Sequence, residues 1–79
     1  MTRSEILGKI RDTLADVLDN ETLSITETTV ADDVADWDSI NHVKLLIALE
    51  SDLGIRFETA EVESLKNVGQ LVDLVESKL

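Results

Sequence analysis

The sequence has no cysteine and no proline, and its only aromatic residues are one tryptophan and one phenylalanine. Without cysteine, neither a disulfide framework nor a thiolate zinc site can form. The absence of disulfides fits a reducing compartment, and there is no secretory signal or apolar run long enough to span a bilayer. We therefore expect a cytoplasmic protein. Because aromatics are so scarce, its core must be built from Leu, Val and Ile.

Basic residues are also few: 7 Lys and Arg stand against 17 Asp and Glu, which gives a net charge of −10. Such a surface repels the phosphates of nucleic acid and of anionic membranes, so we expect it to bind neither. It favours partners with basic patches, since complementary fields accelerate encounter. With 79 residues, the chain is expected to form a single domain, 1–79, and to be a monomer.

Apolar residues recur at helical spacing in three long segments. Thr2 and Glu5 have the spacing of a capping box, Gly54 ends the second segment, Thr59 is expected to cap a short helical piece, and Asn67 caps the last helix. The predicted helices cover residues 3–18, 39–53, 60–64 and 68–79. The predicted fold class is therefore all-α, a small bundle of three main helices plus one short helix.

A long polar connection, residues 19–38, separates the first two predicted helices. Connections of this length in a small domain are usually functional or disordered. This one contains regularly placed apolar residues, which we interpret as anchors that pin it to the bundle: Leu23, Ile25, Val30, Val34 and Trp37. We also expect a short 3₁₀ or helical turn inside it. The connection ends at Asp38 and Ser39, where the second helix begins.

Apolar residues in the predicted helix 39–53 occupy more than one stripe. We assign Val43, Leu46, Leu49 and Leu53 to the core-facing side. Ile40 and Ile47 lie seven residues apart with Lys44 between them, so they share a mostly polar strip. An apolar residue on such a strip is often a contact for a partner.

Asp38 and Ser39 are both favoured residue types at a helix N-cap. A helix N-terminus also has free backbone N–H groups and the positive end of the helix dipole, which together suit a phosphate. From these two residues alone, both a capping role and a chemical role are open.

The segment from Asp36 to Phe57 resembles the central part of acyl carrier proteins. In that family a D-S-L or D-S-I motif, here Asp38-Ser39-Ile40, begins the second helix, and an apolar run ending in Leu-Glu follows. The acidic first helix, the long loop, the short third helix and the Val-led last helix agree over nearly the whole chain.

The resemblance implies a non-catalytic carrier of acyl intermediates. Ser39 would match the serine to which a phosphopantetheinyl transferase attaches 4′-phosphopantetheine from coenzyme A, and the thiol of that arm would hold acyl groups as thioesters. Asp38 would help the transferase to recognise the site. Acyl-loading and acyl-processing enzymes with basic docking patches would contact a partner surface of Ile40, Asn41, Lys44 and Ile47.

The same resemblance implies an apolar gap for the acyl chain between the second and third helices. Its expected lining is Val43, Leu46, Ala60, Val62, Leu65 and Val68. Three positions depart from the common pattern: Trp37 stands where many members have glycine, Asn41 where fatty-acid carriers often have Asp, and Lys44 where they often have Glu. These departures favour a polyketide, hybrid or other secondary pathway over general fatty-acid synthesis.

Three alternatives differ in class. An aminoacyl or peptidyl carrier is the nearest, although Asp36-Trp37-Asp38 does not match its usual Gly-Gly-containing motif. A hydrolase pairing Ser39 with His42 lacks a G-x-S-x-G elbow, and residues three apart on one helix do not readily supply a base and its orienting carboxylate. We interpret His42 as solvent-facing, with a contact to the phosphate or a partner as the other possibility. An acidic cation-binding or interaction module is the most remote, since the segment from Asp32 fails the EF-hand pattern.

Overall fold

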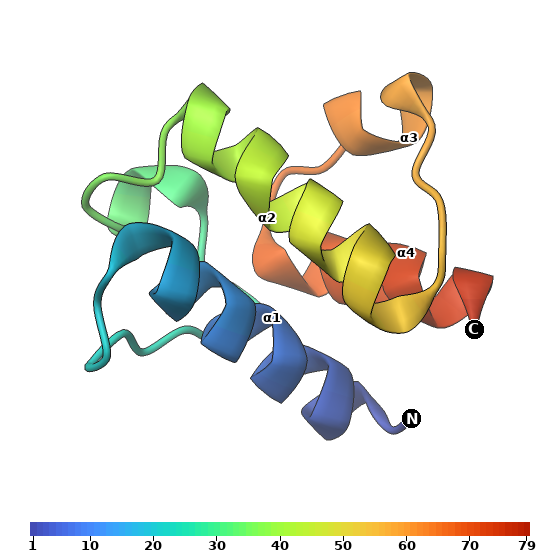
Figure 1. Ribbon diagram of the computed structural model, residues 1–79, viewed down its shortest axis with the longest axis horizontal. Coiled ribbons are helices and arrows are strands. Elements are labelled where there is room, and N and C mark those ends of the chain that lie inside the picture. The colour runs from blue at the N-terminus through green and yellow to red at the C-terminus, as the bar shows by residue number, and fades with distance from the viewer.

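The computed structural model describes residues 1–79 and contains helices but no strands. In chain order the elements are α1 (Arg3–Leu18), the 3₁₀ turn η1 (Ala31–Asp33), α2 (Ser39–Leu53), α3 (Thr59–Glu63) and α4 (Val68–Lys78). This is the predicted all-α bundle of three main helices and one short one. The helix α1 packs against both α2 and α4, while α3 lies at the edge of the bundle (Figure 1).

Capping hydrogen bonds between residues close in the sequence set the boundaries of the long helices. Thr2 and Glu5 form a complete capping box at the start of α1, and the Asn67 side chain accepts from Gln70 N at 2.8 Å at the start of α4. Gly54 ends α2 in a left-handed conformation with φ of 66°. The predicted starts and ends of α1 and α2 are therefore confirmed.

The short helix α3 begins one residue earlier than predicted. Thr59 is its first helical residue, so the expectation that Thr59 caps it is wrong. The cap is Glu58, which has an extended backbone and donates its N–H to Glu61 Oε1 at 2.9 Å. The Glu61 side chain thus satisfies the N–H of the residue before the helix, which is half of a capping box. Because this residue is Glu58, the helix begins at Thr59.

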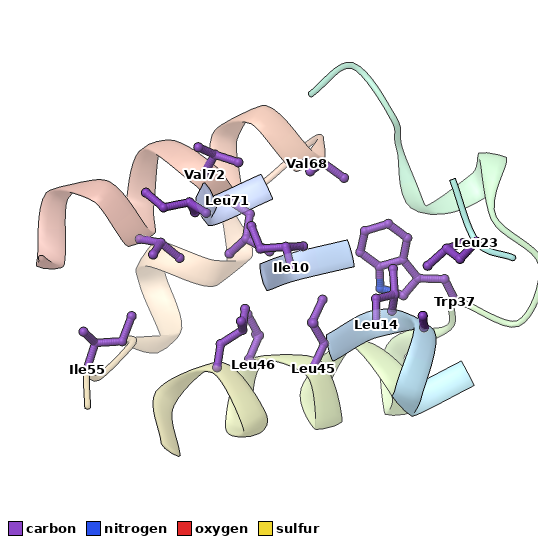
Figure 2. Packing of buried hydrophobic residues seen from close by; sticks show 14 residues of the cluster. Ile10, Leu14, Leu23, Trp37, Leu45, Leu46, Ile55, Val68, Leu71 and Val72 are labelled. Atoms are coloured by element: carbon purple, nitrogen blue, oxygen red, sulfur yellow. The ribbon is translucent and has the colours of Figure 1, made fainter. Parts of the chain in front are cut away.

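One aliphatic core joins the three long helices (Figure 2). Ile6, Ile10 and Leu14 of α1 are fully buried, and Leu45 and Leu49 of α2 meet them. The α4 contribution is Val68, Leu71, Val72 and Val75. The prediction of an aliphatic core is confirmed, with Trp37 as the one aromatic residue in it.

The core-facing side of α2 is rotated relative to the prediction. Val43 is 53% exposed, whereas Leu45 is fully buried. At 100° per residue, Leu45 lies about 40° round the helix from Leu49, while Val43 lies about 120° away. The assignment of Val43 to the core is therefore wrong, and Leu45 takes the central place.

The connection between α1 and α2 is tied to the bundle by its backbone and by its apolar side chains. Thr29 O accepts from Val68 N at 2.9 Å, and Glu27 O accepts from Gly69 N at 2.7 Å, so the connection satisfies two of the free N–H groups at the start of α4. Leu23 and Trp37 are buried, and Ile25 and Val34 pack against the core. The anchoring prediction is confirmed for these four residues.

A cluster of ion pairs around Arg3 also holds the connection to α1 and α4. Arg3 at the start of α1 pairs with Glu27 of the connection and with Asp73 and Glu76 of α4. These carboxylates raise the pKa of Arg3 above its usual value, chiefly through the hydrogen bond to Glu27. The connection is therefore held against both α1 and α4, and it leads directly to the start of α2.

Candidate functional site

The start of α2 is shaped by a tight turn in the residues before it. Asp36 has a left-handed backbone with φ of 69°, a conformation that Asp tolerates better than most residues. Its carbonyl accepts from Asp38 N at 3.0 Å and from the Asn41 side chain at 2.8 Å. The turn places Asp38 in an extended conformation, and its carboxylate accepts from Asn41 N at 2.8 Å as the N-cap.

Ser39 is the first helical residue of α2, and it is exposed. Its hydroxyl makes no hydrogen bond with the protein, and the backbone N–H groups of Ser39 and Ile40 also have no partner. A free hydroxyl beside unpaired N–H groups at the positive end of a helix dipole fits a phosphodiester on that hydroxyl. Asp38, not Ser39, performs the capping, which leaves the serine oxygen available.

Trp37 and His42 form a contact that sequence reasoning missed. The indole Nε1–H donates to His42 Nδ1 at 3.2 Å, and the ring centroids lie 5.9 Å apart. Burial lowers the pKa of His42. The interpretation of His42 as solvent-facing is wrong, because the side chain turns back from α2 onto the buried indole. The available signal was a single histidine one helical turn after Ser39 together with an unusual tryptophan just before it.

An exposed apolar strip runs along the outer side of α2. Ile40 is 68% exposed and Ile47 is 59% exposed, and Val43 lies between them. Lys44 is exposed beside the strip, whereas Asn41 is half-buried and its side chain is bound to Asp36. The four residues predicted as a partner surface are thus close in the helix, but Asn41 also holds the turn.

The residues predicted to line an acyl-chain gap range from buried to exposed. Leu46 and Val68 are buried, Val62 and Leu65 are half-buried against the core, and Val43 and Ala60 are exposed. A small, partly open cavity of about 50 Å³ includes two of the six. Its lining is Ala31, Trp37, His42, Leu65, Lys66, Asn67, Val68 and Leu71. The cavity therefore lies between the end of the connection, the first turn of α2 and the start of α4.

Acidic side chains do not gather into a metal site: no group of three or more His, Asp or Glu residues is placed to hold an ion. None of the helices is both long enough and apolar enough to cross a membrane. The fold and the site together define a class of protein: a small helical bundle that presents an exposed serine hydroxyl at the start of its second long helix.

Comparisons with known proteins narrow this class. The sequence profile of the family described as "Phosphopantetheine attachment site" matches residues 8–75. The chain is 36% identical over 77 residues to the acyl carrier protein of Lactobacillus acidophilus, which covers 98% of this chain and 96% of that protein. It is 34% identical over 80 residues to the acyl carrier protein of Thermosynechococcus vestitus, covering 100% of this chain and 98% of that protein.

Solved structures agree with the sequence comparisons. The holo acyl carrier protein of Geobacter metallireducens superposes with a TM-score of 0.84 at 38% identity, covering 91% of this chain and 83% of that one. An acetyl donor acyl carrier protein, solved in complex with the HMG synthase of the curacin biosynthetic pathway, shares the fold with a TM-score of 0.82 at 23% identity, covering 99% and 100% of the two chains. The chain belongs to the acyl carrier protein family. It is an acyl carrier that bears a 4′-phosphopantetheine group.

Proposed function

We propose that Ser39 is the residue that carries the phosphopantetheine arm. The observation that carries this proposal is the geometry at the start of α2: an exposed hydroxyl with no partner, on the first helical residue, beside two unpaired backbone N–H groups. These N–H groups and the helix dipole stabilise the negative charge of the phosphodiester that would form there. The cap made by Asp38 keeps the helix end intact during and after attachment.

The attachment step would be carried out by a transferase, because no side chain of the protein is hydrogen-bonded to the Ser39 hydroxyl to take its proton, and the Asp38 carboxylate is bound to Asn41 N. The Ser39 oxygen would form a bond to the phosphate next to pantetheine in coenzyme A. The bond from that phosphate to the adenosine bisphosphate part would break, and the serine proton would pass to the transferase. His42 is the only histidine, and its Nδ1 already accepts from Trp37. This arrangement supports a carrier with no catalytic activity of its own, in which the cofactor supplies the thioester chemistry.

Partner enzymes would recognise Asp38 and would bind the exposed apolar strip on α2. The exposed Ile40 and Ile47, with Lys44 beside them, offer an apolar contact next to the attachment point, and the structure adds Val43 to this strip. The net charge of −10 would steer the transferase and the acyl-processing enzymes through their basic patches. We propose that the protein binds these enzymes as a monomer.

The acyl group would be held near α4 when it is not with an enzyme. Of the predicted lining, Leu65 and Val68 border the small cavity beside His42, and Leu46 and Val62 lie in or against the core.

Asn41 and Lys44 make α2 less acidic than the corresponding helix of fatty-acid carriers. This difference supports a role in a polyketide or other secondary pathway, whose enzymes would have docking patches that are less basic than those of fatty-acid synthesis.

The attachment proposal is tested by intact mass. Incubation of the chain with coenzyme A and a broad-specificity phosphopantetheinyl transferase should add one phosphopantetheine, and the Ser39→Ala variant should gain nothing. An equal mass gain in Ser39→Ala would show that another residue is modified, and no gain in the native chain with several transferases would contradict the proposal.

The role of Asp38 in recognition has a matched control within the chain. Asp38 and Asn67 are both N-caps whose side chains accept from the N–H three residues on, at 2.8 Å in each case. Asp38→Ala and Asn67→Ala therefore remove the same interaction from two helices. Only Asp38→Ala should slow the loading of Ser39, and equal loading rates in the two variants would reduce Asp38 to a cap.

A further inference from the structure

The cavity beside the start of α2 is small for a carrier of long chains. Its volume is about 50 Å³, against a share of about 30 Å³ for one water molecule in the liquid and roughly 300–1,000 Å³ for a site that holds a drug-sized ligand. It has room for a group of a few non-hydrogen atoms. Trp37, the largest side chain in the molecule, forms part of its wall and thereby limits its size.

The hydrogen bond between Trp37 and His42 fixes the protonation state of the histidine. Because the indole N–H donates to Nδ1, the imidazole must be neutral and must carry its one proton on Nε2. Burial of the ring favours the same neutral form. Nε2 has no partner in the protein, and His42 is one of the residues that line the cavity, so this ring brings an N–H donor without a protein partner to the site.

The remaining lining is mostly apolar: Ala31, Leu65, Val68 and Leu71. Its two polar residues are Asn67, whose side-chain oxygen accepts from Gln70 N, and Lys66, whose side chain makes no ion pair within the protein. A saturated chain pushed into this space would cover the Nε2–H of His42 without replacing its contact with water, which is unfavourable. A group that combines a short carbon chain with an acceptor oxygen would satisfy both the apolar lining and this donor.

We propose that Trp37 and His42 determine the cargo that this carrier shelters: a short acyl group with an oxygen acceptor beyond the thioester, such as a 3-oxoacyl or 3-hydroxyacyl group. In this arrangement Trp37 sets the length limit and orients His42, and the Nε2–H of His42 donates to the oxygen on the third carbon. Longer saturated chains remain outside. This inference rests on the proposed attachment at Ser39, since the arm brings the acyl group to the cavity.

Acetoacetyl and butyryl groups provide the test, because they match in length and differ in the 3-oxo oxygen. Each group, and octanoyl as a long saturated chain, is installed as its acyl-phosphopantetheine from the acyl-coenzyme A by the phosphopantetheinyl transferase, and loading is checked by intact mass. The rate of thioester exchange with dithiothreitol is then divided by the rate for the same acyl group on free pantetheine. Emission of Trp37, the only tryptophan, reports independently on entry of the group into the cavity.

In the native chain, acetoacetyl should be protected more strongly than butyryl by about 2- to 10-fold, the factor that one net hydrogen bond corresponds to. Octanoyl should be the least protected of the three. His42→Leu, which fills similar space without an N–H donor, should bring acetoacetyl down to the level of butyryl and leave butyryl nearly unchanged. Trp37→Ala, which enlarges the cavity, should extend protection to octanoyl.

Loss of stability alone is controlled by Ile55→Ala, because Ile55 is as buried as Trp37, at 9% exposure, and does not line the cavity. This variant should keep the native order of protection. Equal protection of acetoacetyl and butyryl in the native chain, or octanoyl as the best protected group, would overturn the inference.

A second measurement separates this inference from the attachment proposal. Free acetoacetyl-pantetheine and free butyryl-pantetheine are titrated against the Ser39→Ala variant while Trp37 emission is followed. The inference requires the acetoacetyl compound to change the emission at lower concentration, whether or not Ser39 is the attachment residue. An identical response to both compounds would refute it even if Ser39 is loaded normally.

Discussion

Replacement of Gly69 by alanine should disturb the contact that holds the α1–α2 connection against α4. A Cβ at this position would lie 2.8 Å from Glu27 O and 3.3 Å from both Glu27 Cβ and Asn67 Oδ1. The neighbour at 2.8 Å is backbone, so the connection itself would have to move. The hydrogen bond from Gly69 N to Glu27 O, now 2.7 Å, would lengthen or break with it.

The expected loss follows from these contacts. Overpacking of this kind costs about 1–3 kcal/mol, and a net backbone hydrogen bond contributes about 1 kcal/mol. The better helix propensity of alanine offsets up to about 1 kcal/mol. We therefore expect Gly69→Ala to lower the free energy of unfolding by about 1–3 kcal/mol, a large share of the stability of a domain this small.

Gly8 supplies the matched control. It lies inside α1, and a Cβ there would meet nothing within 4 Å. Gly8→Ala should therefore stabilise the chain by about 0.5–1 kcal/mol through helix propensity alone. The same chemical change should thus have opposite signs at the two glycines.

Urea unfolding followed by circular dichroism measures both variants, and thermal unfolding should shift by about 4–8 °C for each kcal/mol. The urea slope should stay the same, so that the midpoints report stability directly. A Gly69→Ala chain as stable as the native chain would refute the reasoning, because it would show that the connection is not held tightly against α4.

Three further outcomes are expected. Asn67→Ala and Asp38→Ala should each lower the free energy of unfolding by about 0.5–2 kcal/mol, and a neutral result in urea for either would exclude its capping role. Since the pKa of His42 is lower in the folded chain, its contribution to stability is present above about pH 6.5 and is lost as the pH falls through the folded pKa. The stability gap between the native chain and His42→Gln should therefore narrow from pH 7.5 to pH 5, and a constant gap contradicts this. Added salt should raise the melting temperature of the native chain, which carries a net charge of −10, and should shrink the loss caused by Arg3→Gln; a salt-independent loss would show that Arg3 acts through packing.

Features that depend on neighbours in the chain could be predicted from the sequence. The capping box of Thr2 and Glu5, the cap at Asn67 and the left-handed Gly54 each involve residues a few positions apart, and each was found where its spacing placed it. The motif at Asp38 and Ser39 likewise depends on local geometry, so the exposed helix start was predictable too. The cap of α3 was missed because two adjacent residues, Glu58 and Thr59, could both serve.

Features that depend on rotation about a helix axis or on contacts between distant segments could not be predicted in the same way. In α2 the apolar residues cover so much of the circumference that the sequence does not fix which side faces inward, and Val43 was placed on the wrong one. The bonds from Glu27 and Thr29 to α4 span about 40 residues and leave no pattern in the sequence. The contact between Trp37 and His42 requires the path of the turn at Asp36, which only the structure gives.

The backbone bonds between the connection and α4 also order events during biosynthesis. Thr29 and Glu27 precede Ser39 in the chain, yet their carbonyl groups find donors only in Val68 and Gly69, which the ribosome makes later. A nascent chain that has emerged only as far as α2 lacks the support that positions its serine. We therefore expect a phosphopantetheinyl transferase to modify completed chains faster than chains that end before α4.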